Sequence, residues 1–119
     1  MKKLFLILIL LFIAGCNSSI FTLESSKLVA ENFIKNSETY KFDGIPESFK
    51  YTGFEQLNCN YCWKHRLEYD SSQAGYGDRK DKMLAQVITH HIILVNVEQN
   101  QVSSAIVDNK WDEINQKEL

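Results

Sequence analysis

Hydrophobic and polar residues alternate most regularly in the stretch from residue 63 to residue 70. One set of alternate positions holds Trp63, His65, Leu67 and Tyr69, and the other holds Lys64, Arg66, Glu68 and Asp70. One face of this segment is therefore largely aromatic or aliphatic, and the opposite face is charged. This pattern predicts a strand of an antiparallel sheet that is covered on one side only.

A helical spacing of apolar residues precedes this strand. Thr22 or Ser25 can accept a backbone N–H at the start of a helix, and Asn36 is suited to its end. We therefore predict a helix from about Leu23 to Lys35. Its apolar stripe consists of Val29, Ala30, Phe33 and Ile34.

The remainder of the chain has the patterns of β structure. The predicted strands are Tyr40–Phe42, Ser48–Leu57 with a bend at Gly53, Leu84–Glu98, and Val102–Val107 after a tight turn at residues 99–100. In this arrangement Asp70 would lie near Met83, and Cys62 would lie near His91. We expect an α+β fold, with one N-terminal helix packed on one face of a four- to five-stranded antiparallel sheet.

The first fifteen residues have the pattern of a secretory signal. Lys2 and Lys3 precede an unbroken apolar run from Leu4 to Ala14. A run of about eleven residues is too short for a permanent membrane span, which needs about twenty. Ile13-Ala14-Gly15-Cys16 resembles the bacterial lipobox, whose cysteine receives diacylglycerol before cleavage. This resemblance implies a lipidated Cys16 in the cell envelope, on the extracytoplasmic side of the outer or the cytoplasmic membrane.

These features divide the chain into four parts. We expect a signal peptide in residues 1–15, the lipidated cysteine and a short tether in 16–22, one α+β domain in 23–113 and a polar tail in 114–119. Without Lys2 and Lys3, eleven basic side chains remain against fifteen acidic ones, a formal net charge of −4. This acidic balance argues against nucleic acid as a partner. The expected partners are the membrane, through the N-terminal lipid, and an envelope protein or a small ligand.

Cys59 and Cys62 remain as a pair once Cys16 carries the lipid. In an oxidising compartment, a disulfide between them would stabilise the domain by about 2 kcal/mol. A redox pair is an alternative, but it needs its first cysteine at a helix N-terminus, and Cys62 instead opens a strand.

A zinc site is the second alternative for the cysteine pair. Cys59, Cys62 and His65 could supply three ligands, with His90 or His91 as the fourth. A shift of one residue in strand register would exchange the faces of His90 and His91. We expect no cofactor, with zinc as the alternative.

The segment from Ser71 to Lys82 is rich in Gly, Ser and Asp and is expected to be a loop. Its Tyr76, Asp78 and Arg79 could present a phenol, a carboxylate and a guanidinium to a ligand or partner. Alternatively, its glycines satisfy positive φ, Tyr76 folds back on the sheet, and Asp78 pairs with Arg79.

Recognisable catalytic motifs are missing from the sequence. It contains no nucleophile-elbow serine and no His-Glu-x-x-His, and its acidic residues are scattered singly. We therefore expect a non-enzymatic binding or interaction domain. The alternative is a thiol-redox or zinc-handling protein centred on Cys59 and Cys62.

Several short motifs resemble a group of small secreted or lipid-anchored prokaryotic domains of unknown function. The motifs are TYKFDG, CNYCW, AGYGDR, LAQVITHH and VDNKWDEI. The layout is similar to the PepSY and cystatin-like folds, an analogy that implies an architecture and no activity. The cystatin pattern Gln-x-Val-x-Gly is not matched, because Gln86-Val87-Ile88-Thr89-His90 lacks the glycine.

Overall fold

The structure, a computed structural model, describes residues 20–119, so Cys16 and the expected signal peptide lie outside the described residues. The six strands form one antiparallel sheet in the order β1-β2-β3-β4-β5-β6. The α+β prediction is confirmed, with slightly more strands than the four or five expected. The elements are α2 (Leu23–Lys35), α3 (Glu38–Asp43), the 3-10 turn η1 (Pro46–Ser48), β1 (Lys50–Gln56), β2 (Cys62–Ser71), β3 (Thr89–Glu98), β4 (Gln101–Val107), β5 (Trp111–Asp112) and β6 (Lys117–Glu118).

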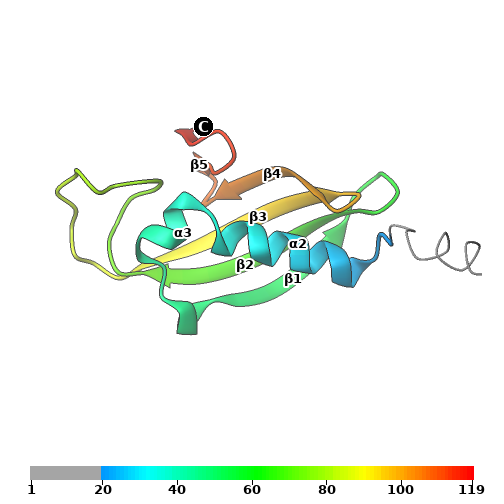
Figure 1. Cartoon of the computed structure of the whole chain (residues 1–119), viewed down its shortest axis with the longest axis horizontal. Coiled ribbons are helices and arrows are strands. Elements are labelled where there is room, and N and C mark those ends of the chain that lie inside the picture. The colour runs from blue at the N-terminus through cyan, green and yellow to red at the C-terminus, as the bar shows by residue number, and fades with distance from the viewer. Residues whose placement is uncertain (1–19) are drawn as a thin grey trace, which may run out of the picture.

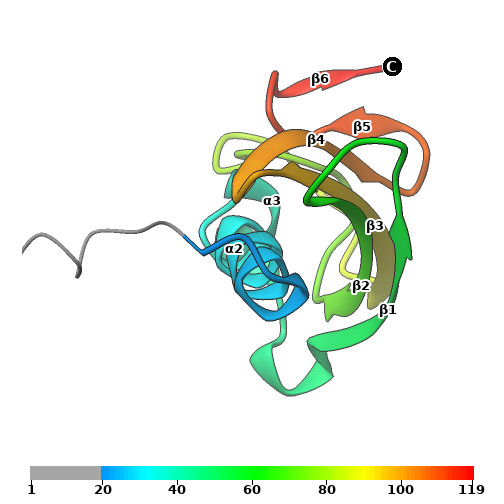
Figure 2. The same cartoon turned by 90° about the vertical axis from the view of Figure 1, so that its right-hand side faces the viewer.

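Helix α2 lies inside the curve of the sheet (Figures 1 and 2). The core therefore sits between one face of this helix and the concave faces of the central strands. The outer face of the sheet carries no helix in the described part of the chain (Figure 2). The buried core residues are Ala30, Ile34, Leu67, Tyr69, Ile93, Val95, Val97, Ala105 and Val107.

The bounds of α2 agree with the sequence prediction. Thr22 and Ser25 form a capping box, in which the Thr22 hydroxyl accepts the Ser25 N–H at 3.0 Å and the Ser25 hydroxyl accepts the Thr22 N–H at 3.0 Å. Asn36 ends the helix. Ala30 and Ile34 face the sheet and are buried, as their helical spacing indicated.

The alternation predicted for β2 is also present. His65, Leu67 and Tyr69 are buried on the concave face, while the charged residues between them are partly exposed. The pairing of β1 with β2 shifts between Tyr51 and Gly53, which is the bend expected at the glycine.

The prediction of a strand at Tyr40–Phe42 is wrong, because these residues belong to α3. The first turn of α3 is stabilised by a residue far away in the sequence. The Glu113 carboxylate accepts both the N–H and the hydroxyl of Thr39, at 3.0 and 2.7 Å. Tyr40 then packs edge-on against Tyr69 in the core. Capping and packing override the β propensity of the two aromatic residues.

The predicted start of the long strand at Leu84 is wrong as well. Strand β2 ends at Ser71, opposite Thr89, so residues 84–88 have no strand to pair with. Asp70 therefore lies opposite His90 instead of Met83. Cys62 lies opposite Glu98 instead of His91.

Two tight turns connect β3, β4 and β5. The predicted turn at Gln99-Asn100 joins β3 to β4, and both residues have positive φ, of 50° and 61°. Asp108 and Asn109 repeat this conformation between β4 and β5, with φ of 53° and 57°. Two consecutive left-handed residues match the twist of the two-residue hairpin between β3 and β4, whereas the β4–β5 connection has Lys110 as a third residue. The segment expected as a polar tail contains β6, which pairs with β5.

Candidate functional site

Arg79 is buried at the base of the long loop between β2 and β3, with 2% of its surface exposed. Its guanidinium pairs with the Asp43 carboxylate of α3 at 2.9 Å and lies over the Phe42 ring. It also donates to the backbone oxygens of Thr39, Ala74, Gly75 and Gly77. The guanidinium is thus not exposed to a ligand, and its carboxylate partner is Asp43 and not Asp78. Such complete pairing is what a buried charge requires.

Thr39 extends this polar cluster toward the C-terminal segment. Its hydroxyl accepts the Gly77 N–H at 2.8 Å and donates to the buried Glu113 carboxylate at 2.7 Å. The loop, α3 and the segment after β5 therefore meet at one hydroxyl. Gly77 has a positive φ of 70°, which brings its N–H toward Thr39.

Tyr76 folds back on the sheet, as one of the two sequence interpretations had it. Its hydroxyl donates to Asp108 at 2.9 Å, and its ring stacks on Trp111 at 5.6 Å between centroids. Burial, together with the hydrogen bond to the Asp108 carboxylate, raises the pKa of Tyr76 to about 12. The phenol therefore stays protonated at neutral pH and serves as a donor to Asp108.

Ser71, His91 and Asp108 form a hydrogen-bonded chain that the sequence analysis did not predict, in which Ser71 and His91 are buried and Asp108 is partly exposed. The Ser71 Oγ lies 3.0 Å from the His91 Nε2, and the His91 Nδ1 lies 2.7 Å from the Asp108 Oδ2. The order of groups is that of a serine hydrolase. However, Ser71 has no exposed surface and also donates to the Gln73 carbonyl at 2.8 Å, so no substrate can reach it in this conformation. These hydrogen bonds instead join β2, β3 and the β4–β5 turn to one another.

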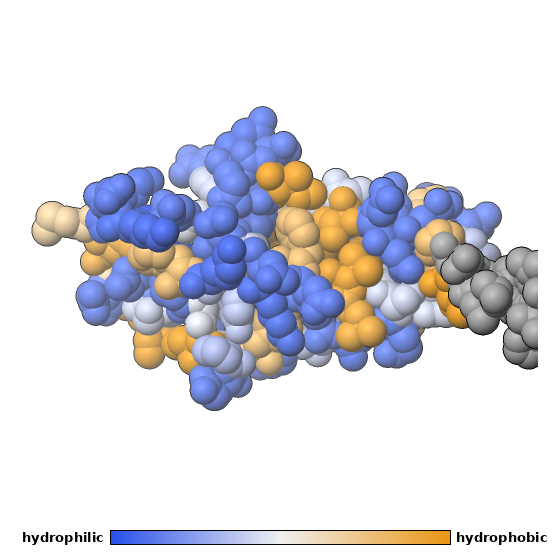
Figure 3. Space-filling model, viewed as in Figure 1, coloured by the Kyte–Doolittle hydropathy of each residue, from blue (hydrophilic) through white to orange (hydrophobic). Residues whose placement is uncertain are grey.

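The second part of the loop, residues 83–88, has the opposite character. Met83 is fully exposed, and Val87 and Ile88 are 59% and 70% exposed. The loop projects from the end of the sheet opposite to that at which α2 begins (Figure 1), and Figure 3 shows apolar surface at this end. Asp78 is exposed nearer the base, where it accepts the Lys80 N–H at 3.2 Å. We name residues 83–88 the loop tip.

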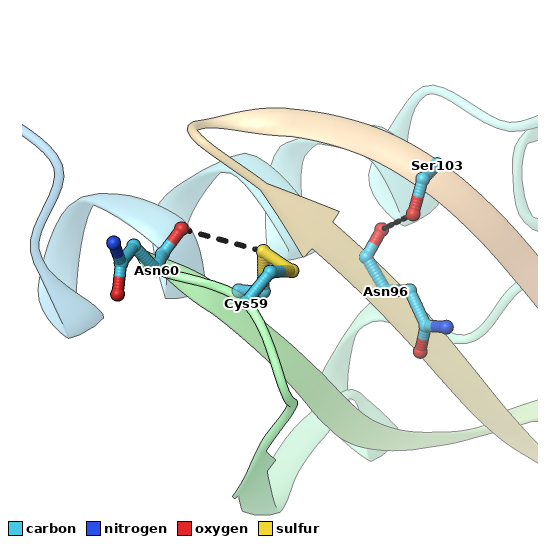
Figure 4. The surroundings of a disulfide bond; sticks show 5 residues. Cys59, Asn60, Asn96 and Ser103 are labelled. Atoms are coloured by element: carbon cyan, nitrogen blue, oxygen red, sulfur yellow. Dashed lines mark hydrogen bonds between the residues drawn. A yellow bond between two sulfur atoms is a disulfide. The ribbon is translucent and has the colours of Figure 1, made fainter.

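A disulfide joins Cys59 to Cys62 at the other end of the sheet, in the connection between β1 and β2 (Figure 4). The disulfide prediction is confirmed. The connection is held further by the Leu57 N–H, which donates to the Cys62 carbonyl at 2.9 Å, and by the Gln99 N–H, which donates to the Tyr61 carbonyl at 3.0 Å. Cys59 precedes a strand and not a helix, so no helix N-terminus stabilises its thiolate.

The four metal-ligand candidates are not brought together. The sulfurs of Cys59 and Cys62 are bonded to each other, and Glu98 is the acidic residue that lies near them. His91 belongs to the hydrogen-bonded chain described above. His90 lies on the outer face of the sheet, with Asp70 and Glu68 at 2.7 Å from its two ring nitrogens.

His65 is a core residue that connects the helix to the sheet. Its Nε2 lies 2.6 Å from the Ser26 hydroxyl of α2, and its Nδ1 lies 2.7 Å from the Tyr51 hydroxyl of β1. Burial, assisted by the charge of Lys27, lowers the pKa of His65. A neutral imidazole with both nitrogens bonded satisfies its polar groups within the core.

A groove of about 660 Å³ runs between α2 and the segment after β5. Its apolar lining comes from Val29, Phe33, Val102 and Ile114, and Asn32 and Glu38 are among its polar residues. Figure 3 shows apolar surface beside α2 on this face of the molecule. The groove is open and lacks convergent catalytic groups, so it can hold an apolar side chain but offers no chemistry of its own.

Comparisons with protein-family models, with curated proteins and with solved structures found no match for this chain. The resemblance to small prokaryotic lipoprotein domains therefore stays a prediction. None of the helices between residues 20 and 119 has the length and apolar character needed to cross a membrane.

Proposed function

We propose that this chain is a lipid-anchored, extracytoplasmic binding domain without enzymatic activity, and that the loop tip is its contact with a protein of the cell envelope. The observation that carries the proposal is the exposure of Met83, Val87 and Ile88 on a loop whose base is fixed by Arg79. Exposed apolar side chains that gather on a positioned loop are typical of a binding site.

The proposed location rests on two features. The first is the lipobox-like Ile13-Ala14-Gly15-Cys16, which would attach the chain to the membrane. The second is the Cys59–Cys62 disulfide, a bond that persists in oxidising compartments outside the cytoplasm. Because the loop lies at the end of the sheet away from the start of α2 (Figure 1), a chain tethered at its N-terminus can direct the tip away from its own membrane.

The proposal of a non-enzymatic role rests on the state of the groups that could do chemistry. Ser71 and His91 are closed to solvent, and the cysteine sulfurs form a disulfide. Nucleophilic catalysis needs an accessible nucleophile next to its base. These groups are better suited to hold the loop in place than to transform a substrate.

Site-specific photocrosslinking in intact cells tests the contact. A photoreactive amino acid at Met83 of the full chain should give a discrete protein adduct, and one at Glu118 should not. The double substitution Val87→Asp and Ile88→Asp should remove the Met83 adduct, because charged residues resist burial in an apolar contact. Leu28→Asp is the matched control, since Leu28 is an exposed apolar residue on α2.

The type of adduct decides the outcome. A protein adduct that disappears with the Val87 and Ile88 substitutions, but persists in the Leu28 variant, supports the proposal. Adducts to lipid alone would show that the tip enters a membrane, and an unchanged adduct in the double variant would place the contact elsewhere. Either of these results would overturn the proposed role of the tip.

A further inference from the structure

The outer face of the sheet has an apolar centre. Ile92 and Leu94 of β3 and Ile106 of β4 alternate with the buried residues of their strands, and all three are partly exposed. They line a hollow of about 440 Å³ together with Arg66, Asp108 and Asn109. Apolar residues on both faces are typical of a strand that is covered on both sides. In the described residues, α2 covers the concave face only.

The charges beside this apolar centre are ordered along β2. Lys64 and Arg66 occupy the first half of the outer row, and Glu68 and Asp70 occupy the second half. The pairing of β2 with β3 places Arg66 opposite Leu94 and Glu68 opposite Ile92. The change from positive to negative charge therefore falls at the same level of the sheet as the midpoint between Leu94 and Ile92.

We propose that the outer face binds a second copy of this chain. The two copies are related by a two-fold axis that lies between their outer faces and runs perpendicular to the strands. The axis passes over the midpoint between Leu94 and Ile92. The axis sets the β2 strands of the two copies antiparallel over each other. It places Lys64 and Arg66 of one copy over Asp70 and Glu68 of the other. The same rotation places Leu94 of each copy over Ile92 of the other, so the charged row and the apolar centre are both self-complementary.

Three of the four charged groups of β2 on this face, Arg66, Glu68 and Asp70, are already paired within one copy, which lowers the cost of removing water from them. Arg66 donates to Glu68 at 2.9 Å and to the Thr52 hydroxyl at 2.9 Å. His90 bridges Glu68 and Asp70. Association therefore buries no carboxylate of β2 without a partner, and the second copy adds attraction to a face that is close to neutral.

The size of the face fits a weak dimer. Four strands spaced about 4.8 Å apart, with a usable length of roughly 25 to 30 Å, offer at most about 500 to 600 Å² of projected area per copy, and the convex curvature of this face reduces the part that two copies bring into contact. A standard protein interface buries about 800 Å² of accessible surface per partner, and smaller contacts form transient complexes. We expect a dimer that depends on concentration at the membrane surface. The inference does not depend on the loop tip and its proposed partner.

Charge reversal on β2 gives a test that distinguishes self-association from binding to another protein. The double variant Lys64→Glu and Arg66→Glu carries an entirely negative row, and the double variant Glu68→Lys and Asp70→Lys carries an entirely positive row. The full chain is produced in cells with two different tags, crosslinked with formaldehyde at the membrane before extraction in detergent, and captured by one tag while the other is quantified. Each double variant should capture itself at least about tenfold less than the unchanged chain does, because like charges face each other.

Co-production of the two double variants should restore capture to the level of the unchanged chain or above it. The matched control is Lys110→Glu with Lys117→Glu, which makes the same charge change at exposed positions in and beyond the β4–β5 turn and should leave self-capture unchanged. Circular dichroism melting checks that each variant is folded. The single variants Lys64→Glu and Asp70→Lys, which keep the Arg66–Glu68 pair, repeat the test with smaller perturbations.

Restored capture in the mixed pair is the result that supports the two-fold arrangement. Three results would overturn the proposal: no self-capture of the unchanged chain, equal self-capture by the double variants, or no recovery when the two folded variants are combined.

Discussion

The two parts of the loop between β2 and β3 differ in almost every physical respect. Residues 72–82 are held by buried polar groups, with Arg79 paired to Asp43 and Tyr76 bonded to Asp108. Residues 83–88 follow directly and expose Met83, Val87 and Ile88. In the first part the charged side chain of Arg79 is inside, and in the second part three apolar side chains are outside.

This difference shows that residue type alone does not identify the contact surface. The charged and aromatic groups of Gly75-Tyr76-Gly77-Asp78-Arg79 look like ligand-binding groups in the sequence, yet Arg79 and Tyr76 fix the loop. The aliphatic residues that look like a strand are instead displayed to solvent. The first part of the loop positions the second.

The largest effect should come from Arg79→Met. Removing the guanidinium leaves the Asp43 carboxylate buried without its partner, so we expect a loss of about 3 to 5 kcal/mol in the free energy of unfolding, measured by urea denaturation. Lys80→Met is the control, because Lys80 is exposed, and its effect should stay within about 0.5 kcal/mol. A loss of less than about 1 kcal/mol for the Arg79 variant would show that the network does not fix the loop.

A smaller loss is expected for Tyr76→Phe. The ring can still stack on Trp111, but Asp108 loses the hydroxyl donor, which should cost about 2 kcal/mol for a hydrogen bond to a charged group. The same denaturation measurement applies. Tyr61→Phe provides the comparison, since Tyr61 is about half exposed, and an equal loss in both variants would contradict the assigned role.

Protonation of the Asp108 carboxylate at acid pH should reduce the stability of the first part of the loop, residues 72–82. Burial raises the pKa of this carboxyl, but the hydrogen bonds from His91 and the Ile92 N–H outweigh it and lower the pKa below its usual 3.8. A lowered pKa in the folded state contributes stability that is fully present above the unfolded pKa. That contribution is lost as the pH falls through the lower, folded value.

Amide hydrogen exchange can follow this effect between pH 5 and pH 2.5 after correction for the intrinsic exchange rates. Protection of residues 72–82 should fall with acid more in the unchanged chain than in Asp108→Asn, which has no carboxyl to protonate at this position. Equal falls in both proteins would mean that another group controls the loop.

The smallest effect on stability is expected at the loop tip. Val87→Ser with Ile88→Ser removes exposed apolar groups, so the free energy of unfolding should change by no more than about 0.5 kcal/mol. The same substitutions should abolish the proposed crosslink from Met83. A large loss of stability would show that the tip packs on the domain, and the contrast between the two parts of the loop would then fail.

The sequence was most informative where an element is specified by its own residues. Helix α2 carries its capping residues and its apolar stripe within fifteen consecutive positions, and its predicted bounds are confirmed. The alternation of β2 and the left-handed turn at Gln99-Asn100 are equally local. Such patterns need no knowledge of distant partners.

The predictions that were wrong depend on partners far away in the chain. Helix α3 is stabilised by Glu113, 74 residues from Thr39, and Arg79 is buried because α3 supplies Asp43. The start of β3 is set by the end of β2 and not by the apolar residues before Thr89. The hydrogen bonds among Ser71, His91 and Asp108 depend on the register between β2 and β3, which the sequence prediction had wrong.

The order of the strands also has a consequence for how the domain assembles. Every strand pairs with its neighbour in sequence, and a two-residue turn connects β3 to β4 while three residues connect β4 to β5. Joining β2 to β3 instead requires closure of the 17 residues between Ser71 and Thr89. Loop-closure entropy makes that step about 2 kcal/mol more costly than closing a two-residue turn. We therefore expect the C-terminal hairpins to form early, and the docking of Arg79 against α3 to follow once this larger loop has closed.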